Sequence, residues 1–393
     1  MFSPPLFLRP IGATVLGSIL LGSVLPGAVA TLPPASPNEI VLDIPSTPEH
    51  PRNSEGAFVT LQSGRILLIY SQFSGGDRDG SSARLAEVHS DDGGGTWSVP
   101  AVLRDKENNL NVMSVSLLRL ASGKIALFYL VKKTNLECRP SMAVSTDEGK
   151  SWSQPHPLFD APGYYVLNND RIIQTRQGRL IAPVAFHRAV HADPADQRSV
   201  SDRGIALLWY YSDDEGGTWS EAASVWGMTL ASRNGLQEPG LVELTDGSLL
   251  SWARTDQGAQ YALRSVDAGN HWTPPEGTEL VSPLSPASIK RLPGSAELLA
   301  VYNDHSGRFP FRATENPYHG REPLVAAISH DSGYTWPQRK LLEGDTDGAF
   351  AYIAIHFTEA GVLLAYSAGQ EKGAHLGTLR VRRLARSWLL GSP

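Results

Sequence analysis

Short runs of apolar residues recur along the chain, and each follows a turn of two residues that contains glycine. The runs are residues 65–70, 124–129, 179–184, 248–253, 297–302 and 362–366. The turns are residues 63–64, 122–123, 177–178, 246–247, 294–295 and 360–361. Nearly continuous apolar runs of this length are typical of strands that are covered on both faces. The pattern therefore predicts six β-hairpins whose second strands are buried.

A second repeat has the pattern Ser-x-Asp-x-Gly-x-(Thr/Ser/His)-Trp. It occurs five times, at residues 90–97, 145–152, 212–219, 265–272 and 329–336. In each octet the aspartate can accept hydrogen bonds inside a turn, the glycine can adopt a positive φ, and the tryptophan can pack the turn onto a sheet. Five matching octets indicate a repeated structural unit.

The two repeats together predict one closed β architecture. Successive hairpins are separated by the length of a four-stranded blade and its loops. The sixth unit has no octet and ends in residues 376–384, which we expect to pair with residues 39–44 and so leave no free sheet edge. We predict an all-β fold, a six-bladed β-propeller with little helix, over residues 38–393.

Composition excludes several classes of function. The chain has 34 Lys+Arg against 40 Asp+Glu, so it has no basic excess with which to bind nucleic acid. Its one cysteine, Cys138, excludes a disulfide framework and a cysteine-based metal site, and we expect a buried thiol. His187 and His191 lie near Asp193 without a clear third ligand. We expect no metal and no cofactor.

The first thirty residues differ from the rest of the chain. Arg9 is their only charge, residues 11–25 are largely apolar, and residues 28–30 are small. This pattern predicts a secretory signal peptide over residues 1–30, followed by a proline-rich lead over residues 31–37. The mature chain would be secreted or periplasmic, with no membrane span. The alternative is an uncleaved membrane anchor.

Candidate functional residues lie where a propeller places its ligands, over the central axis at the ends of the innermost strands. The corresponding stretches are residues 52–55, 111–114, 168–171, 236–239, 285–288 and 350–352.

The octets resemble the Asp boxes of the sialidase (neuraminidase) superfamily, in which these boxes are structural. Other spacings resemble its catalytic motifs. Glu238 precedes Arg254 by sixteen residues, Arg321 begins an Arg-x-x-Leu motif, and Tyr352 stands nine residues before Gly361. The chain is most similar to a bacterial sialidase-like branch over roughly residues 38–385. Its signatures there are residues 53–56, 167–171, 237–240 and 283–288.

The resemblance implies a role for each matched residue. Tyr352 would be the nucleophile, and Glu238 would be the base that accepts its proton. Arg254 and Arg321 would bind the substrate carboxylate.

The first blade departs from the family pattern. Arg52, the counterpart of the remaining carboxylate-binding arginine, lies about two residues further from its hairpin glycine than the family spacing. Asp77 and Asp79 bracket the position expected for the acid/base aspartate, and the sequence does not choose between them.

Other polar residues on the same stretches are candidates for further substrate contacts. They are Glu55, Arg139, Asn169, Asp170 and Arg171. Arg139 and Arg171 could equally form salt bridges between blades.

The resemblance implies a secreted exo-α-sialidase-like glycoside hydrolase. It would remove terminal sialic acid, or a related acidic sugar, from a glycan with retention, through a tyrosyl–glycosyl intermediate. Two alternatives remain: a carbohydrate-binding propeller without activity, and a hydrolase or lyase that acts on a different polysaccharide in the same pocket.

Overall fold

The computed structural model describes residues 36–228, 232–314, 320–370 and 376–391. The predicted signal peptide and most of the proline-rich lead lie outside the described residues. Over the described ranges the fold is all-β, as predicted, with one short helix, α1 (Arg386–Leu390), and one 3-10 turn. None of the helices in these ranges is long and apolar enough to cross a membrane.

Four sheets of the described chain contain four antiparallel strands each, and in three of them the strands follow one another in the sequence. The first has the order β2 (Asn53–Thr60), β3 (Ile66–Ser74), β4 (Ser82–Ser90), β5 (Ala101–Arg104). The second has the order β15 (Gln237–Glu243), β16 (Leu249–Arg254), β17 (Ala259–Ser265), β18 (Glu276–Val281). The third has the order β19 (Ser288–Arg291), β20 (Leu298–Asn303), β21 (Leu324–Ser329), β22 (Gln338–Glu343). In each sheet a predicted hairpin joins the first two strands.

A larger sheet combines two of the predicted blades. Its main path runs β14-β13-β12-β10-β8-β7-β6, with β9 on β8 and β11 on β12. The bounds are β6 (Asn111–Arg119), β7 (Ile125–Thr134), β8 (Glu137–Ser145), β9 (His156–Pro157), β10 (Tyr164–Val166), β11 (Ile173–Gln174), β12 (Leu180–Ala189), β13 (Val200–Ser212) and β14 (Ser220–Glu221). The short strand β10 pairs with β8 on one side and β12 on the other, so hydrogen bonds connect the two groups.

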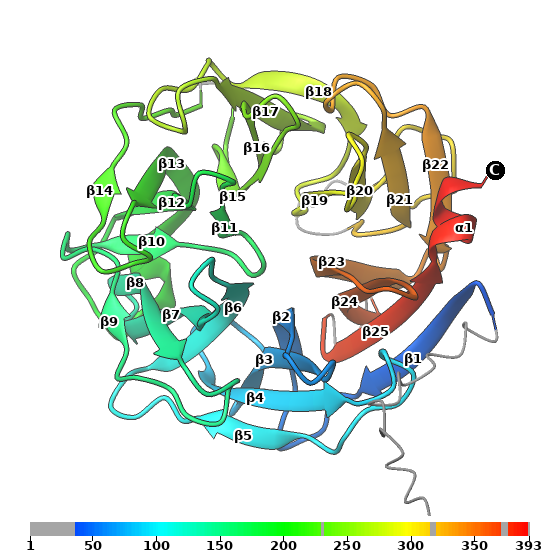
Figure 1. Cartoon of the computed structure of the whole chain (residues 1–393). Helices are drawn as coiled ribbons and strands as arrows, with labels where there is room; N and C mark the ends of the chain where they lie inside the picture. The colour runs from blue at the N-terminus through cyan, green and yellow to red at the C-terminus, as the bar shows by residue number, and fades with distance from the viewer. Residues whose placement is uncertain (1–35, 229–231, 315–319, 371–375, 392–393) are drawn as a thin grey trace, which may run out of the picture. The chain divides into compact units, whose positions relative to one another are not determined.

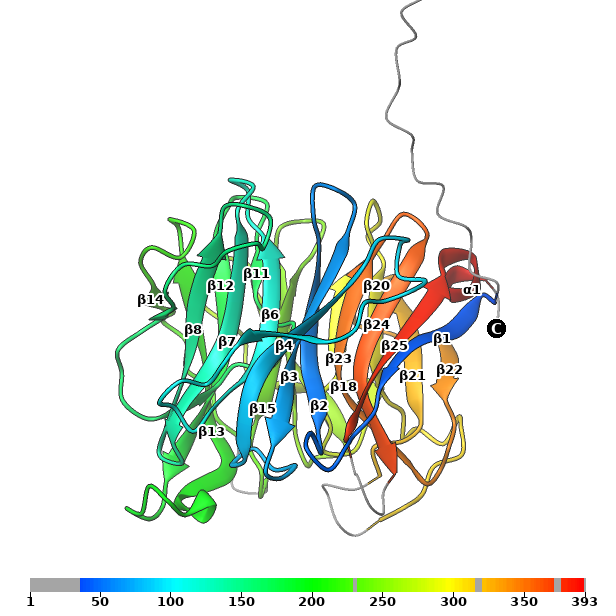
Figure 2. The same cartoon turned by 90° about the horizontal axis from the view of Figure 1, so that it is seen from below.

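The first strand of the described chain pairs with the last, as predicted. β1 (Asn38–Ile44) lies antiparallel to β25 (Thr378–Ala385), which pairs in turn with β24 (Gly361–Gln370) and β23 (Gly348–Phe357). Figure 1 shows the sheets arranged in a ring about a common centre. Figure 2 shows that their strands run between the two faces of this ring.

Apolar side chains of neighbouring sheets form the core. Phe58 and Leu68 of the first sheet, for example, pack in one cluster with Leu363 and Val381 of the last sheet. Cys138 is a buried free thiol, as predicted. The second strand of each hairpin is buried along most of its length, which explains the nearly continuous apolar runs of the sequence. These strands are β3, β7, β12, β16, β20 and β24.

The five octets make the same hydrogen bonds. In the first octet the Ser90 hydroxyl donates to Asp92 (2.8 Å), the Gly94 amide donates to Ser90 (2.9 Å), and the Thr96 amide donates to Asp92 (2.9 Å). The other four repeat this set. Each octet joins the third strand of its group to the outermost strand, so the octets lie away from the inner strands.

One carboxylate links the last two sheets. Glu343 of β22 accepts hydrogen bonds from Arg380 (3.0 Å), Arg382 (2.8 Å) and the Tyr366 hydroxyl (2.6 Å). Desolvation raises the pKa of Glu343, but these hydrogen bonds and the Arg382 charge outweigh it, and the net pKa is lowered. The ionised carboxylate therefore stabilises the folded chain.

We predict that Glu343→Gln lowers the free energy of unfolding by about 1.5–3 kcal/mol at neutral pH. Because the folded pKa is lowered, this contribution is present above the unfolded pKa and is lost as pH falls through the folded pKa. The difference from wild type should therefore shrink in acid, as urea unfolding at several pH values would show. Glu107→Gln, at an exposed ion pair, is the control and should change stability by less than about 0.5 kcal/mol. A pH-independent difference would contradict the prediction.

Candidate active site in the central cavity

Four of the innermost strands share a local distortion. β2, β6, β15 and β23 each shift register against their partner strand, and a non-glycine residue at the shift has a positive φ. These residues are Glu55 (55°), Ser114 (60°), Glu238 (46°) and Tyr352 (59°). Such bulges re-aim side chains, and the strained backbone costs about 1–3 kcal/mol at each site. All four residues line one cavity.

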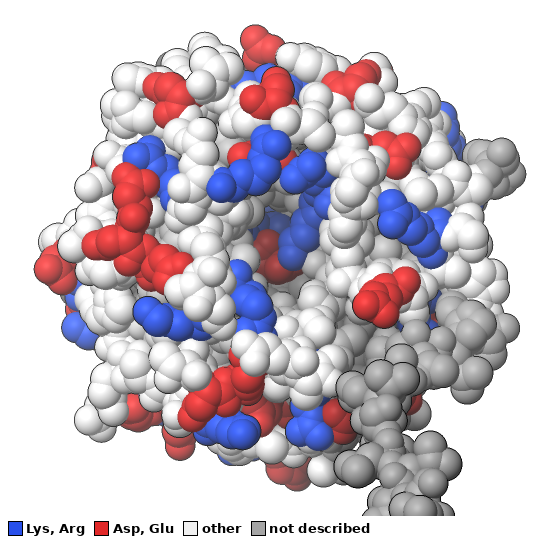
Figure 3. Space-filling model, in the orientation of Figure 1, with Lys and Arg blue, Asp and Glu red and all other residues white. Residues whose placement is uncertain are grey.

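The cavity has a volume of about 880 Å³. Figure 3 shows the hollow at the centre of the ring, with lysine and arginine side chains on its walls. The ionisable lining residues are Glu55, Arg78, Asp79, Lys132, Tyr164, His187, Arg198, Glu238, Arg254, Arg321 and Tyr352. Around the described part of the chain, no group of three or more His, Cys, Asp or Glu residues converges as a metal site.

Arg52 is buried beside this cavity despite its unusual spacing in the sequence. Its guanidinium pairs with Glu55 and with Asp79 (2.6 Å). The same group lies 5.6 Å from the centre of the Tyr352 ring and 4.4 Å from that of Phe73. The structure therefore brings Arg52, Asp79 and Tyr352 together.

Two further guanidinium groups reach the cavity. Arg254 pairs with Glu238 (3.0 Å) and donates to the side chain of Gln237 (2.6 Å). Arg321 lies 5.4 Å from the centre of the Tyr352 ring. Its Nε and Nη1 atoms are buried and have no acceptor among the residues that the structure describes. Buried donors of this kind favour an anion that can supply acceptors.

The electrostatic setting of Tyr352 keeps its phenol protonated. Burial raises its pKa, the Arg321 and Arg254 charges lower it, and Glu238 raises it again, with a raised pKa as the net result. A phenol with a raised pKa needs a base before it can act as a nucleophile. Glu238 lines the same cavity and is the sequence-predicted base.

The two candidate acid/base residues differ in their position relative to the cavity. The Asp79 carboxylate lines the cavity and is 55% exposed, whereas Asp77 is not among the lining residues. Arg52 contacts only the backbone carbonyl of Asp77 (3.2 Å). Desolvation raises the pKa of Asp79, but the charges of Arg52 and Lys132 outweigh it, so the net pKa is lowered. In the free protein Asp79 is therefore an ion-paired carboxylate.

Three predicted substrate contacts connect the inner strands instead of lining the cavity. Asn169 donates to backbone carbonyls of β2 (2.9 Å) and β23 (3.1 Å). Asp170 pairs with Lys290 of β19 (2.7 Å) and accepts a hydrogen bond from a β23 amide (2.9 Å). Arg171 donates to the Ser288 hydroxyl of β19 (2.8 Å). The contacts of these three side chains link neighbouring sheets.

Of the two remaining candidates for substrate contacts, one lines the cavity and the other does not. Glu55 lines the cavity and accepts a hydrogen bond from the Ser114 hydroxyl (2.7 Å). Arg139 pairs with Glu137 and donates to the Asp160 carbonyl (3.1 Å), and it does not line the cavity.

Sequence reasoning missed several cations of the cavity wall. Arg78, Lys132 and Arg198 line it, from the β3–β4 loop, from β7 and from the 3-10 turn before β13. No sequence signal marked them, because charged residues in loops and at the ends of hairpins are ordinary.

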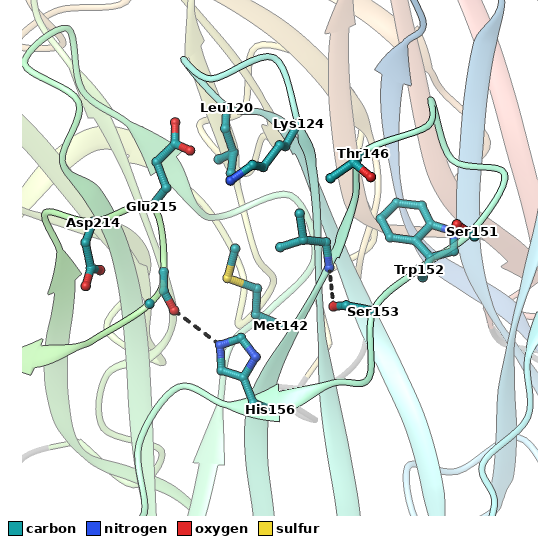
Figure 4. A pocket seen from close by; sticks show the side chains of 13 residues that line it. Leu120, Lys124, Met142, Thr146, Ser151, Trp152, Ser153, His156, Asp214 and Glu215 are labelled. Carbon is teal, nitrogen blue, oxygen red and sulfur yellow. Dashed lines mark hydrogen bonds between the residues drawn. The ribbon is translucent and has the colours of Figure 1, made fainter.

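A second cavity of about 530 Å³ lies between two octets. Figure 4 shows its apolar floor, which includes Met142, and the hydrogen bond between His156 and the Gly216 carbonyl (3.2 Å). Of its two carboxylates, Asp214 is held by its own octet through Ser212 and Thr218, and Glu215 accepts a hydrogen bond from the Ser122 amide (2.8 Å). The central cavity, with its buried cations and tyrosine, is therefore the candidate active site.

We predict that Asp170→Asn lowers the free energy of unfolding by about 1–3 kcal/mol, because it leaves Lys290 without a carboxylate and weakens a tie between sheets. Thermal unfolding followed by circular dichroism would measure the loss. Asp160→Asn, at an exposed position, is the matched control and should stay within about 0.5 kcal/mol of wild type. Equal stabilities of the two variants would show that Asp170 is not a structural tie.

Comparison with known proteins identifies the family of this chain. Residues 109–364 match the family model described as "BNR repeat-like domain". A sialidase of Bacteroides fragilis (strain YCH46) is 26% identical over 345 residues, which are 78% of this chain and 58% of that protein. This chain therefore matches less than two thirds of the length of that relative.

Solved structures show the same fold. The intramolecular trans-sialidase from Ruminococcus gnavus has a TM-score of 0.69 and 16% identity, over 90% of this chain and 98% of that chain. The leech intramolecular trans-sialidase has a TM-score of 0.67 and 16% identity, over 91% of this chain and 71% of that chain. The chain therefore belongs to the BNR repeat-like family, within the sialidase superfamily.

Proposed function

We propose that the protein is an exo-α-sialidase-like glycoside hydrolase that removes a terminal sialic acid, or a related acidic sugar, from a glycan. The observation that carries this proposal is the position of one buried tyrosine, Tyr352. The guanidinium groups of Arg52 and Arg321 lie near its ring, and that of Arg254 lines the same cavity. Arg321 has two buried donors that meet no acceptor within the described ranges of the chain. A sugar carboxylate fits this arrangement, because guanidinium groups bind carboxylates bidentately.

The nucleophile follows from the charge of the substrate. Sialic acid carries a carboxylate on its anomeric carbon, and a carboxylate nucleophile would be repelled by it. Neutral Tyr352 attacks that carbon while Glu238 accepts the phenol proton, and the glycosidic bond breaks as the Tyr352 oxygen bonds to the sugar. Water then hydrolyses this intermediate, so the configuration is retained.

Asp79 is the proposed acid/base residue. It protonates the leaving oxygen and later removes a proton from the attacking water. Its lowered pKa in the free protein results largely from Arg52. When the substrate carboxylate binds Arg52, part of that positive charge is neutralised, and the pKa of Asp79 rises toward the value that acid catalysis needs.

The remaining parts of the proposal concern architecture and location. We count the nine-stranded sheet as two blades joined by β10, which makes six blades, and we assign the five octets as Asp boxes in a single domain over residues 38–393. Residues 1–30 would direct secretion or periplasmic export, and the lead of residues 31–37 would follow cleavage. The partner is a glycan, and the proposed chemistry uses no cofactor.

A second candidate is a carbohydrate-binding propeller that no longer catalyses a reaction. The ion pair between Asp79 and Arg52 favours it, because an ionised carboxylate cannot donate a proton. Hydrolysis or lytic cleavage of a different acidic polysaccharide in the same cavity is the third. Assays with a fluorogenic sialoside, and a glycan array if no cleavage occurs, distinguish the three.

We predict that Tyr352→Phe reduces kcat on a fluorogenic α-sialoside by about 10³-fold or more, because the variant lacks the nucleophilic oxygen. The change removes one atom and should leave the fold intact by circular dichroism. Tyr129→Phe, at a buried tyrosine outside the cavity, is the matched control and should retain activity. Full activity in Tyr352→Phe would disprove the mechanism.

The choice between the two aspartates gives a separate prediction. Asp79→Asn should lower kcat/KM on sialyllactose by about 10²–10⁴-fold, the usual contribution of general acid–base catalysis. Asp77→Asn should change it by less than about threefold, because the Asp77 side chain does not line the cavity. The reverse ranking of the two variants would assign the role to Asp77.

A further inference from the structure

The loop that carries Asp79 is held from a neighbouring sheet. It joins β3 to β4 and contains Gly75, Gly76 and Gly80, which allow the backbone many conformations. Two side chains from β6 and β7 donate to the same carbonyl of this loop. The Asn111 amide lies 2.8 Å from the Asp79 carbonyl oxygen, and the Lys132 ammonium lies 3.0 Å from it.

The two donors form one unit. Asn111 and Lys132 face each other across the β6–β7 ladder, and their exposed fractions are 0% and 3%. Asn111 also donates to the Ser81 carbonyl (2.9 Å), so the unit holds both ends of the segment 79–81.

Lys132 has no role in the proposed mechanism, yet its ammonium is buried. Burial of an ammonium is costly, and desolvation accordingly lowers the pKa of Lys132. The ammonium donates to a carbonyl of a glycine-rich loop, and the Asp79 charge acts on it. The ammonium also lies 5.2 Å from the centre of the Tyr164 ring, but its hydrogen bond goes to the Asp79 carbonyl, which indicates that the position of that carbonyl matters.

We propose that Lys132 and Asn111 are positioning residues that keep Asp79 at the leaving oxygen after the substrate has bound. In the free protein Asp79 is held twice, by Arg52 at its carboxylate and by this pair at its carbonyl. A substrate carboxylate competes for Arg52 and weakens the first hold. The hydrogen bonds from Lys132 and Asn111 to the Asp79 carbonyl then keep this residue in position. This inference rests on the proposed function.

The test compares two sialosides that differ in their need for an acid. An aryl sialoside with a phenolic leaving group of low pKa departs with little help, whereas sialyllactose needs its leaving oxygen protonated. Lys132→Met should lower kcat/KM on sialyllactose by about 10²-fold, the cost of a catalytic group displaced by about 1 Å. On the aryl sialoside the loss should be below about fivefold. The isosteric Asn111→Asp, which turns the amide donor into an acceptor, should show the same ratio.

Two controls separate positioning from general damage. Lys340→Met removes a lysine of the outer strand β22 that donates to the Trp388 carbonyl, and it should leave the ratio of the two substrates unchanged. In an Asp79→Asn background, Lys132→Met should cause no further loss on sialyllactose, because the group that it positions is already inactive.

Each outcome decides the inference. If Lys132→Met lowers kcat/KM equally on both substrates, Lys132 is not a positioning residue for Asp79. The same holds if its full effect on kcat/KM is added to that of Asp79→Asn. If Lys132→Met does not fold, Asn111→Asp is judged by the same ratio. A wild-type protein that cleaves neither sialoside would overturn the proposed function and this inference together. An active wild type with an unchanged ratio in the variants would overturn the inference alone.

Discussion

The bulge in the inner strands is the constraint on which the central site depends. A regular inner strand would pack alternate side chains against the two neighbouring sheets and would point none of them along the axis. At each bulge the strand has one extra residue, and a residue there has a positive φ. The four positive-φ residues line one cavity: Glu55, Ser114, Glu238 and Tyr352. The strain is tolerated because the partner strands are buried along most of their length and fix the backbone.

Charge balance is the second constraint. Arg52 is compensated by Glu55 and Asp79, and Arg254 by Glu238, whereas two donors of Arg321 face no acceptor among the described residues. This uneven pairing leaves a place for one anion and explains why a carboxylated sugar is the proposed ligand. The same ion pairs lower the pKa of Asp79, and in the proposed mechanism they couple substrate binding to acid catalysis through Arg52.

Part of the site could be predicted from the sequence. Glu238 and Arg254 pair because a hairpin of fixed length places them on neighbouring strands. Asp79 could not be distinguished from Asp77, because the path of a glycine-rich loop depends on contacts from another sheet. Asn169, Asp170 and Arg171 were predicted as ligand contacts, and their side chains bond to β2, β19 and β23 of other sheets, which no pattern in their own segment indicates. The bridging role of β10 had no signal, since a three-residue strand has no periodicity.

The sequence by itself determined the hairpins, the octets and the pairing of the first strand with the last. These depend on glycine φ, aspartate hydrogen bonds and apolar runs, which involve residues close in the chain or strands with strong patterns. Only the tertiary structure decided which charges reach the axis and which tie the sheets. That choice depends on bulges and loop contacts, and a shift of one residue sends a side chain to the opposite face of its strand.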